Sequence, residues 1–299
     1  MKNPLKWILP WLAAATLTAC GTPSQKSAQP PWPTVKVSVN TDSSLLTLPI
    51  QIAQNLNFFS REHIRVEIVQ NSVASLYVSH SPKVWPLLGN LASKPDLFLI
   101  APAPDPHFRL KALNHLPLCF AANLKSDDPL IRSIMALNQT HPYLEALSFG
   151  QIENLWKKRQ LPWAIVDLSQ YLRLDQQGPH SVILNWLGAS TGQIPMVIIA
   201  GRSPNTVEFL RALNLALWYI HTSSPTTIAH VLNSTRQKFW RQQIVMGLHY
   251  DVWPPTTYIS PQEYNRGRAL YGLISQETWP PYYSGVDAQL SRQAFSSAY

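Results

Sequence analysis

The stretch 34–68 changes its hydrophobic period twice, and this change restricts the possible folds more than any other feature of the chain. Apolar and polar residues alternate over 35–39, as in a half-buried strand. From Pro49 to Phe59 the apolar residues fall at near-helical spacing, and alternation returns over 64–68. A strand, helix and strand in this order predict parallel strands joined by a crossover helix, and therefore an α/β fold.

The rest of the chain continues to alternate short apolar strands with helical segments, which predicts a second α/β lobe. Ser203 and Pro204 predict the start of the clearest helix, because Ser is a favoured N-cap and Pro fits the first turn. The proline-rich run 102–106 predicts a domain edge. The predicted strands are 97–101, 116–122, 164–166, 181–184 and 196–200, and the other predicted helices are 85–91 and 152–159.

The first 33 residues have the layout of a secretory signal followed by a tether. Two lysines precede the apolar run 7–15, which is about half as long as the roughly 20 residues that a membrane span needs. A Leu-Thr-Ala-Cys tetrad ends at Cys20, and 21–33 is rich in Pro, Ser, Gln and Thr. The tetrad resembles the lipobox of bacterial lipoproteins. This resemblance implies a signal peptide over 1–19, lipid on Cys20, a tether over 20–33 and an anchored position on the extracytoplasmic face of the cell membrane.

Charge and cysteine content exclude some partners and bonds. The net charge is +8, but the basic residues form no repeated stripe, and their densest run is 157–159. This distribution argues against a nucleic-acid partner. If Cys20 carries lipid, Cys119 is left as a single thiol and no intrachain disulfide can form. Cys119 lies in an apolar stretch, which predicts a buried thiol rather than a nucleophile.

No enzyme signature is present in the sequence. The nine histidines are scattered without an H-E-x-x-H motif, and neither a glycine-rich phosphate loop nor a G-x-S-x-G elbow occurs. We therefore predict a protein that is not an enzyme, with no catalytic residue, no metal site and no cofactor.

A family resemblance begins in the first predicted helix. Pro49, the pair Ala53 and Gln54, the pair Phe58 and Phe59, and Glu62 come in order before an alternating strand. This order resembles the solute-binding lipoproteins of ABC importers for nitrate, sulfonates, taurine and thiamine-pyrimidine precursors. The segments 95–98, 195–199, 204–221 and 282–294 resemble later elements of the same family, so the resemblance covers most of the mature chain.

The resemblance implies a type II periplasmic-binding-protein fold, in which two α/β lobes close on a solute. It places lobe one at 34–107 and 202–299, and a shortened lobe two at 108–201, with crossings near 103–113 and 196–202. It implies an ABC permease and ATPase as partners, besides the solute and the membrane surface. The alternative is a lipoprotein that kept this fold but serves as an interaction or sensory partner without transport.

Ligands of open α/β sheets bind outside the carboxyl ends of the strands, so polar and aromatic residues that follow predicted strands are the candidate contacts. Each candidate has a structural alternative: turn chemistry at 40–44 and 71–72, capping of a helix at Leu168 by Asp167, and core packing for the tryptophans. The predicted ligand-binding residues are Asn40, Thr41, Asp42, Ser43, Asn71, Ser72, Trp163, Asp167 and Trp186.

The chain departs from the family in the first part of lobe two. No glycine occurs between Asp127 and Ser148, where family members carry a glycine-rich turn. A second amide-lined anion site is therefore not expected, while Trp163 and Trp186 offer flat apolar surfaces. We predict a small, partly planar organic solute of the sulfonate or pyrimidine-precursor class rather than a bare inorganic oxyanion.

Overall fold

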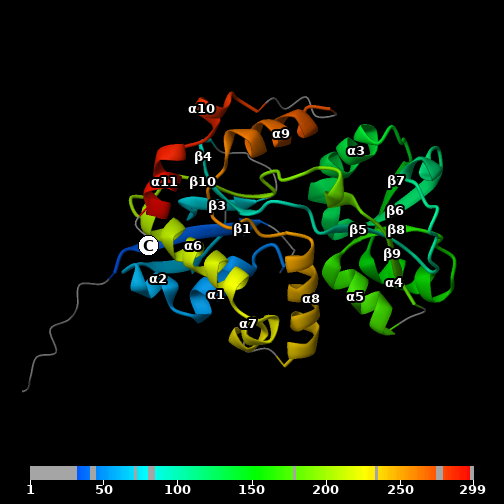
Figure 1. Cartoon of the computed structure of the whole chain (residues 1–299), viewed down its shortest axis with the longest axis horizontal. Helices are drawn as coiled ribbons and strands as arrows, with labels where there is room; N and C mark the ends of the chain where they lie inside the picture. Colours follow the sequence, from blue (N-terminus) through cyan, green and yellow to red (C-terminus); the bar gives the residue numbers. More distant parts are fainter. Residues whose placement is uncertain are drawn as a thin grey trace, which may run out of the picture. The chain divides into compact units, whose positions relative to one another are not determined.

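Two β-sheets with equivalent strand orders form the framework (Figure 1). Within the described residues, sheet A has the order β2-β1-β3-β10-β4 and sheet B the order β7-β6-β8-β5-β9. The strand β10 runs antiparallel to both of its neighbours in sheet A, and β5 does the same in sheet B. The predicted α/β class is confirmed, and sheet B matches sheet A in its number of described strands.

The computed structural model describes residues 32–40, 45–70, 73–79, 85–177, 180–232, 235–273 and 279–296. The predicted signal peptide and Cys20 lie outside these residues. None of the helices in the described ranges is long and apolar enough to cross a membrane.

Sheet A and sheet B draw their strands from different parts of the chain. Sheet A contains β1 (Thr34–Asn40), β2 (Arg65–Ile68), β3 (Leu76–Ser79), β4 (Leu87–Ala92) and β10 (Val197–Gly201). Sheet B contains β5 (Leu97–Ala101), β6 (Pro117–Ala121), β7 (Tyr143–Leu147), β8 (Ala164–Asp167) and β9 (Val182–Trp186).

The helices lie between and after these strands. They are α1 (Leu48–Asn55), α2 (Phe58–Arg61), α3 (Asp128–Leu137), α4 (Phe149–Lys157), α5 (Leu168–Gln177), α6 (Thr206–Thr222), α7 (Pro225–Val231), α8 (Gln237–His249), α9 (Pro261–Tyr271), α10 (Tyr282–Gly285) and α11 (Ala288–Ser296). Short 3-10 helices are η2 (Leu110–Leu113), η3 (Ala122–Asp127) and η4 (Leu187–Ala189).

The first strand–helix–strand unit forms as its hydrophobic pattern predicts, with one break. In β1, Val35 and Val37 are fully buried while Lys36 is exposed. The helix predicted over 49–59 is divided into α1 and α2 by Asn57, which has a left-handed backbone with φ of 57°. Asparagine tolerates this conformation better than most residues, so the chain can turn there.

Two local predictions are wrong. The helix predicted over 85–91 is the strand β4, every residue of which is buried. Such a strand carries no alternation, because both of its faces are covered. The long helix α6 begins at Thr206 with Asn205 in the N-cap position, rather than with Ser203 as the cap and Pro204 as the first residue.

The chain passes from sheet A to sheet B between β4 and β5, and returns between β9 and β10. We refer to residues 93–96 and 187–196 as the crossing region. Both passages come earlier than the predicted crossings near 103–113 and 196–202. The predicted lobe ranges, 34–107 with 202–299 and 108–201, remain a proposal. The strand pairing differs from them at two strands: β5 falls in the range of lobe one but pairs in sheet B, and β10 falls in the range of lobe two but pairs in sheet A.

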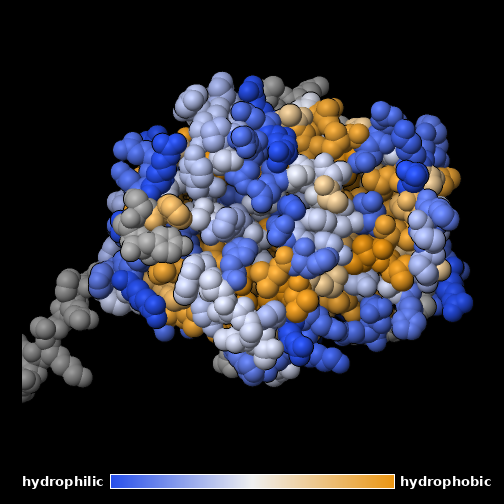
Figure 2. All heavy atoms as spheres, viewed as in Figure 1, coloured by the Kyte–Doolittle hydropathy of each residue, from blue (hydrophilic) through white to orange (hydrophobic). Residues whose placement is uncertain are grey.

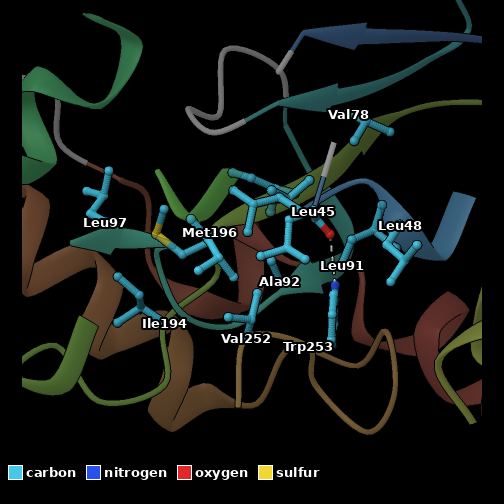
Figure 3. Packing of buried hydrophobic residues seen from close by; sticks show 14 of the residues in the cluster. Leu45, Leu48, Val78, Leu91, Ala92, Leu97, Ile194, Met196, Val252 and Trp253 are labelled. Carbon is cyan, nitrogen blue, oxygen red and sulfur yellow. Dashed lines mark hydrogen bonds between the residues drawn. The ribbon is translucent and has the colours of Figure 1, made fainter. Parts of the chain in front are cut away.

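Buried apolar side chains pack around the crossing region (Figure 3). Backbone hydrogen bonds join its two passages: the Ile194 amide donates to the Ser93 carbonyl at 2.9 Å, and the Met196 amide to the Ala92 carbonyl at 2.8 Å. A third segment joins them, since the Ser93 amide donates to the Val252 carbonyl at 2.8 Å. On the face shown in Figure 2, hydrophobic residues gather in patches between hydrophilic ones.

Candidate functional site

The carboxyl ends of the parallel strands lie at the edge of each sheet from which the crossing region leaves. In sheet A, Ser79 at the end of β3 pairs with Asn40 at the end of β1 and with Ile198 near the start of β10. In sheet B, the start of β5 places Leu97 opposite Asp167 and Phe98 opposite Trp186. Polar groups at these two edges are therefore the candidate site, as expected of open α/β sheets.

Asp167 ends β8 and caps the helix that follows directly. Its Oδ1 accepts the Gln170 amide at 2.8 Å, while Gln170 Oε1 accepts the Asp167 amide at 3.1 Å. This is a reciprocal capping arrangement at the N-terminus of α5. Asn123, on η3 after β6, completes the network by donating Nδ2 to Asp167 Oδ2 at 3.1 Å and accepting Gln170 Nε2 at 2.7 Å. The structural alternative for Asp167, helix capping, is thus observed.

Burial sets the protonation behaviour of this network. Asp167 is 4% exposed, and its burial raises the pKa of the carboxyl group, with a smaller contribution from the charge of Asp127. The hydrogen bonds from Gln170 and Asn123 act in the opposite direction. A carboxyl group of this kind holds its proton at a higher pH than an exposed aspartate does.

Three helices begin at this edge of sheet B. The N-terminus of α4 has the uncharged N-cap Ser148 in a capping box with Gln151, whereas the N-termini of α3 and α5 already carry carboxylates. Asp127 occupies the N-cap position of α3, and Asp128 follows in its first turn and pairs with Arg132 at 2.9 Å. Asp167 fills the same place before α5. Negative side chains at a helix N-terminus satisfy its partial positive charge, so neither the α3 nor the α5 terminus is open to a bare oxyanion.

Trp186, the last residue of β9, borders the crossing region and contacts residues 94–95 and Tyr250. Its indole Nε1 donates to the Pro95 carbonyl at 3.0 Å, and Lys94 Nζ lies 4.9 Å from the ring centroid. Tyr250, which follows α8, places its ring centroid 4.7 Å from that of Trp186. The side chain is half-buried, so part of its surface remains open to a ligand.

The other predicted residues divide into two groups. Trp163 precedes β8 and so lies at the opposite end of that strand from Asp167, which leaves a ligand contact at Trp163 without support. Asn40 closes β1. Its side chain, with Thr41, Asp42, Ser43, Asn71 and Ser72, lies outside the described residues, and their ligand contacts stay predictions.

Sequence reasoning missed Asn123, Gln170, Lys94 and Tyr250. The spacing of Asp167 and Gln170 fits the capping-box pattern and could have identified one pair. Lys94 and Tyr250 carry no local signal, because long-range packing alone brings them to Trp186. Cys119 is 7% exposed, and burial, with the nearby Glu145 charge, raises the pKa of its thiol. Among the described residues, no three His, Cys, Asp or Glu side chains gather in a way that could hold a metal.

Neither a protein-family model nor a curated protein gives a significant match to the chain. Solved structures do. A protein from Bordetella bronchiseptica RB50 matches with a TM-score of 0.68 at 11% identity, covering 88% of this chain and 97% of that one. The periplasmic aliphatic sulphonate binding protein SsuA from Escherichia coli matches with a TM-score of 0.59 at 12% identity, covering 88% and 92%.

The alkanesulfonate-binding protein SsuA from Xanthomonas axonopodis pv. citri, bound to MOPS, matches with a TM-score of 0.56 at 13% identity, covering 84% of this chain and 96% of that one. At these identities the matches show the fold. Sheet A contains β10 and sheet B contains β5, each in the fourth place of its sheet. Together with this strand order, the matches establish that the chain has the two-lobed periplasmic-binding-protein fold of type II.

Proposed function

We propose that the chain is an extracytoplasmic solute-binding lipoprotein of an ABC importer, which captures a small organic solute between its two lobes. The observation that carries this proposal is the arrangement of the two sheets, whose parallel strands end at the edges joined by the crossing region. Such an arrangement suits closure of two lobes on a ligand. The SsuA structures with the same fold are described as sulfonate-binding proteins, which supports this role.

The chemistry of the edge of sheet B favours an organic solute over a bare oxyanion. Asp127, Asp128 and Asp167 lie at the N-termini of α3 and α5, two of the three helices that begin at this edge and could otherwise supply amide donors to an anion. Trp186 and Tyr250 offer aromatic surface at the same edge. A partly planar solute would gain about 0.5–1.5 kcal/mol from stacking beyond the burial of its area.

A ligand panel tests the proposal. The full chain is heated with nitrate, sulfate, taurine, alkyl sulfonates, aromatic sulfonates and aminopyrimidines in turn. A solute present at 100 times its Kd stabilises the folded state by about 2.7 kcal/mol, which gives a measurable rise in Tm. We expect the planar members to raise Tm and the inorganic ions to leave it unchanged. A response to nitrate or sulfate alone would overturn the solute class.

Two tryptophan variants make the test specific. Trp186→Ala should abolish the rise in Tm, while Trp186→Phe, which keeps a flat ring but loses the hydrogen bond to Pro95, should retain part of it. Trp163→Ala is the matched control, because that half-buried tryptophan lies at the other end of β8. If small-angle scattering shows no compaction with a solute that binds, closure of the lobes is wrong. If no panel member binds, the result favours the alternative function, in which the lipoprotein is an interaction or sensory partner without transport.

The anchor is tested separately. In a bacterial host with an intact lipoprotein pathway, the chain should fractionate with membranes and incorporate labelled palmitate, since Cys20 follows the apolar run of the signal. Cys20→Ala should lose the label, and Cys119→Ala, which removes the buried thiol, should keep it. Label that persists in Cys20→Ala would contradict lipidation at this position.

A further inference from the structure

A cavity of about 810 Å³ lies between α5 and α8, and its lining begins at Ser169 in the first turn of α5, next to the Asp167 cap. Ser169, Arg173 and Gln176, which lie on one face of α5, form one wall, and residues in and just before the first two turns of α8 form the other. The volume falls within the usual range of about 300–1,000 Å³ for small-molecule pockets. It exceeds what a single inorganic ion would fill.

The lining of this cavity carries one sign of charge. Arg173, Arg236 and Lys238 contribute cationic groups, and no acidic residue is among the described residues that line it. Glu153, which is not among the described lining residues, pairs with Arg173 at 3.1 Å and offsets part of its charge, and the guanidinium group lies over the ring of Phe149. A concave site lined by one sign of charge attracts ligands of the opposite sign.

The first turn of α8 adds to the positive potential. Arg236 occupies its N-cap position without a side-chain cap hydrogen bond, and no acidic residue lies in the first turn. The leading amide groups of a 13-residue helix therefore keep their partial positive charge at this wall of the cavity. The N-terminus of α3, where Asp127 and Asp128 lie, has the opposite character.

The two walls belong to different halves of the protein. The helix α5 follows β8 of sheet B, whereas α8 packs on α7, which packs on α1 beside sheet A. Across the cavity, Gln176 Nε2 donates a hydrogen bond to Gln242 Oε1 at 3.0 Å. An anion that contacts both Arg173 and Arg236 would add further links between the halves.

We propose that this cavity binds an organic anion with two or more negatively charged groups, and that the bound anion holds α5 against α8. Two negative groups match cations on both walls, and Ser169, Gln176 and Gln242 supply hydrogen bonds to the polar body of the ligand. Neither Trp186 nor Tyr250 is among the described residues that line this cavity, so the proposed ligand is a second one, which acts on lobe closure in addition to the transported solute.

Isothermal titration of the full chain in detergent, with pyrophosphate and citrate as probes, tests the site. We expect binding that weakens as NaCl is raised, because exposed charges are screened. Arg173→Gln and Arg236→Gln should each weaken it about tenfold, as expected for the loss of a charge-assisted hydrogen bond. Arg241→Gln is the matched control, since Arg241 is exposed on α8 and does not line the cavity.

Hydrogen exchange supplies the second readout, because a bridging anion should slow exchange in both α5 and the first turn of α8. Equal weakening by Arg241→Gln, or absence of binding by both probes, would overturn the site, and protection of α8 alone would overturn the bridge. Binding only to vesicles that contain phosphatidic acid would contradict the proposal that the ligand is a soluble anion. The Tm response to planar solutes should survive in Arg236→Gln, so a failure here is distinguishable from failure of the proposed function.

Discussion

Two tryptophans are held by the same local construction in different parts of the molecule. Trp253, after α8, donates its indole Nε1 to the Leu45 carbonyl at 3.0 Å, and Trp186 donates to the Pro95 carbonyl at the same distance (Figure 3 shows the first pair). Each ring also lies against a glycine, Gly247 for Trp253 and Gly188 for Trp186. They differ in burial: Trp253 is 2% exposed, whereas Trp186 is half-buried.

This difference separates a core contact from a contact that can change. Trp253 is enclosed by buried aliphatic side chains, so its removal leaves a space that the core cannot easily fill. Trp186 meets a cation and a backbone carbonyl of the crossing region, from Lys94 and Pro95, and the ring of Tyr250 from the segment after α8. A two-lobed protein needs contacts of the second kind where its halves are joined, because each such contact costs little to rearrange.

The largest expected effect comes from removing each ring. Trp253→Ala should lower the free energy of unfolding by about 3–5 kcal/mol, the usual cost of truncating a large buried side chain. Trp186→Ala should cost about 1–2 kcal/mol, because part of its surface is already in water. Urea unfolding of the two variants and the parent checks the order. Equal losses would mean that Trp186 is as fully part of the core as Trp253.

The two glycines offer a more specific comparison. A Cβ at Gly247 would lie 2.5 Å from the Trp253 ring, and a Cβ at Gly188 would lie 2.6 Å from the Trp186 ring. Gly247→Ala should cost about 1–3 kcal/mol, because the enclosed Trp253 cannot move away. Gly188→Ala should cost less than about 1 kcal/mol, since Trp186 can shift toward solvent.

Thermal unfolding of the single variants, and of each glycine variant combined with loss of its tryptophan, measures the coupling. The clash should disappear in the double variant Gly247→Ala with Trp253→Ala, so the two losses should not add. Full additivity would show that the glycine is required for a reason other than the ring.

The sequence predicts elements whose signal is local. The period of 35–39 identifies β1, and the position of Asp167 before Leu168 predicts a helix cap as the alternative to a ligand contact. It does not predict β4, since a strand covered on both faces has lost its alternation. The exchange of β5 and β10 between sheets is also hidden, because strand partners are chosen by long-range packing.

The candidate site shows the same limit at the level of single residues. Trp163 and Trp186 both flank predicted strands in the sequence, but one precedes its strand and the other ends it. Since β8 and β9 run in the same direction, these positions lie at opposite edges of sheet B, and the end of β9, not the start of β8, meets the crossing region. Reading strand direction as well as strand position would have separated the two tryptophans.

A smaller effect concerns the cation over Trp186. Lys94 is 16% exposed, and its Nζ lies 3.7 Å from Asp251 Oδ2 as well as over the indole ring. Lys94→Met should cost about 0.5–1 kcal/mol through the lost cation–π contact. Asp251→Asn is the control, because it removes the exposed ion pair alone and should cost less. A larger loss from Asp251→Asn, measured by urea unfolding, would assign the stabilisation to the ion pair.

The smallest expected effect appears at alkaline pH. The ring of Tyr250 lies against Trp186, and burial raises the pKa of its hydroxyl above the ordinary value of about 10. Above that pH the unfolded chain loses this proton while the folded chain retains it. Stability contributed by this group is therefore fully present below about pH 10 and is lost as the pH rises through the folded pKa. Tyr250→Phe removes the titrating hydroxyl and keeps the ring.

The decline in Tm between about pH 8 and about pH 11 should thus be shallower in Tyr250→Phe than in the parent. Buried tyrosines elsewhere, such as Tyr264 with its pKa raised to about 12, titrate in both proteins and cancel in the difference. The same comparison in a Trp186→Ala background should give a smaller difference, because loss of the neighbouring ring admits water to Tyr250. In a Trp253→Ala background it should be unchanged. If the difference in Tm decline between Tyr250→Phe and the parent changes in the Trp253→Ala background instead, the two tryptophan regions are coupled. The contact between Trp186 and Tyr250 then cannot rearrange independently of the core around Trp253.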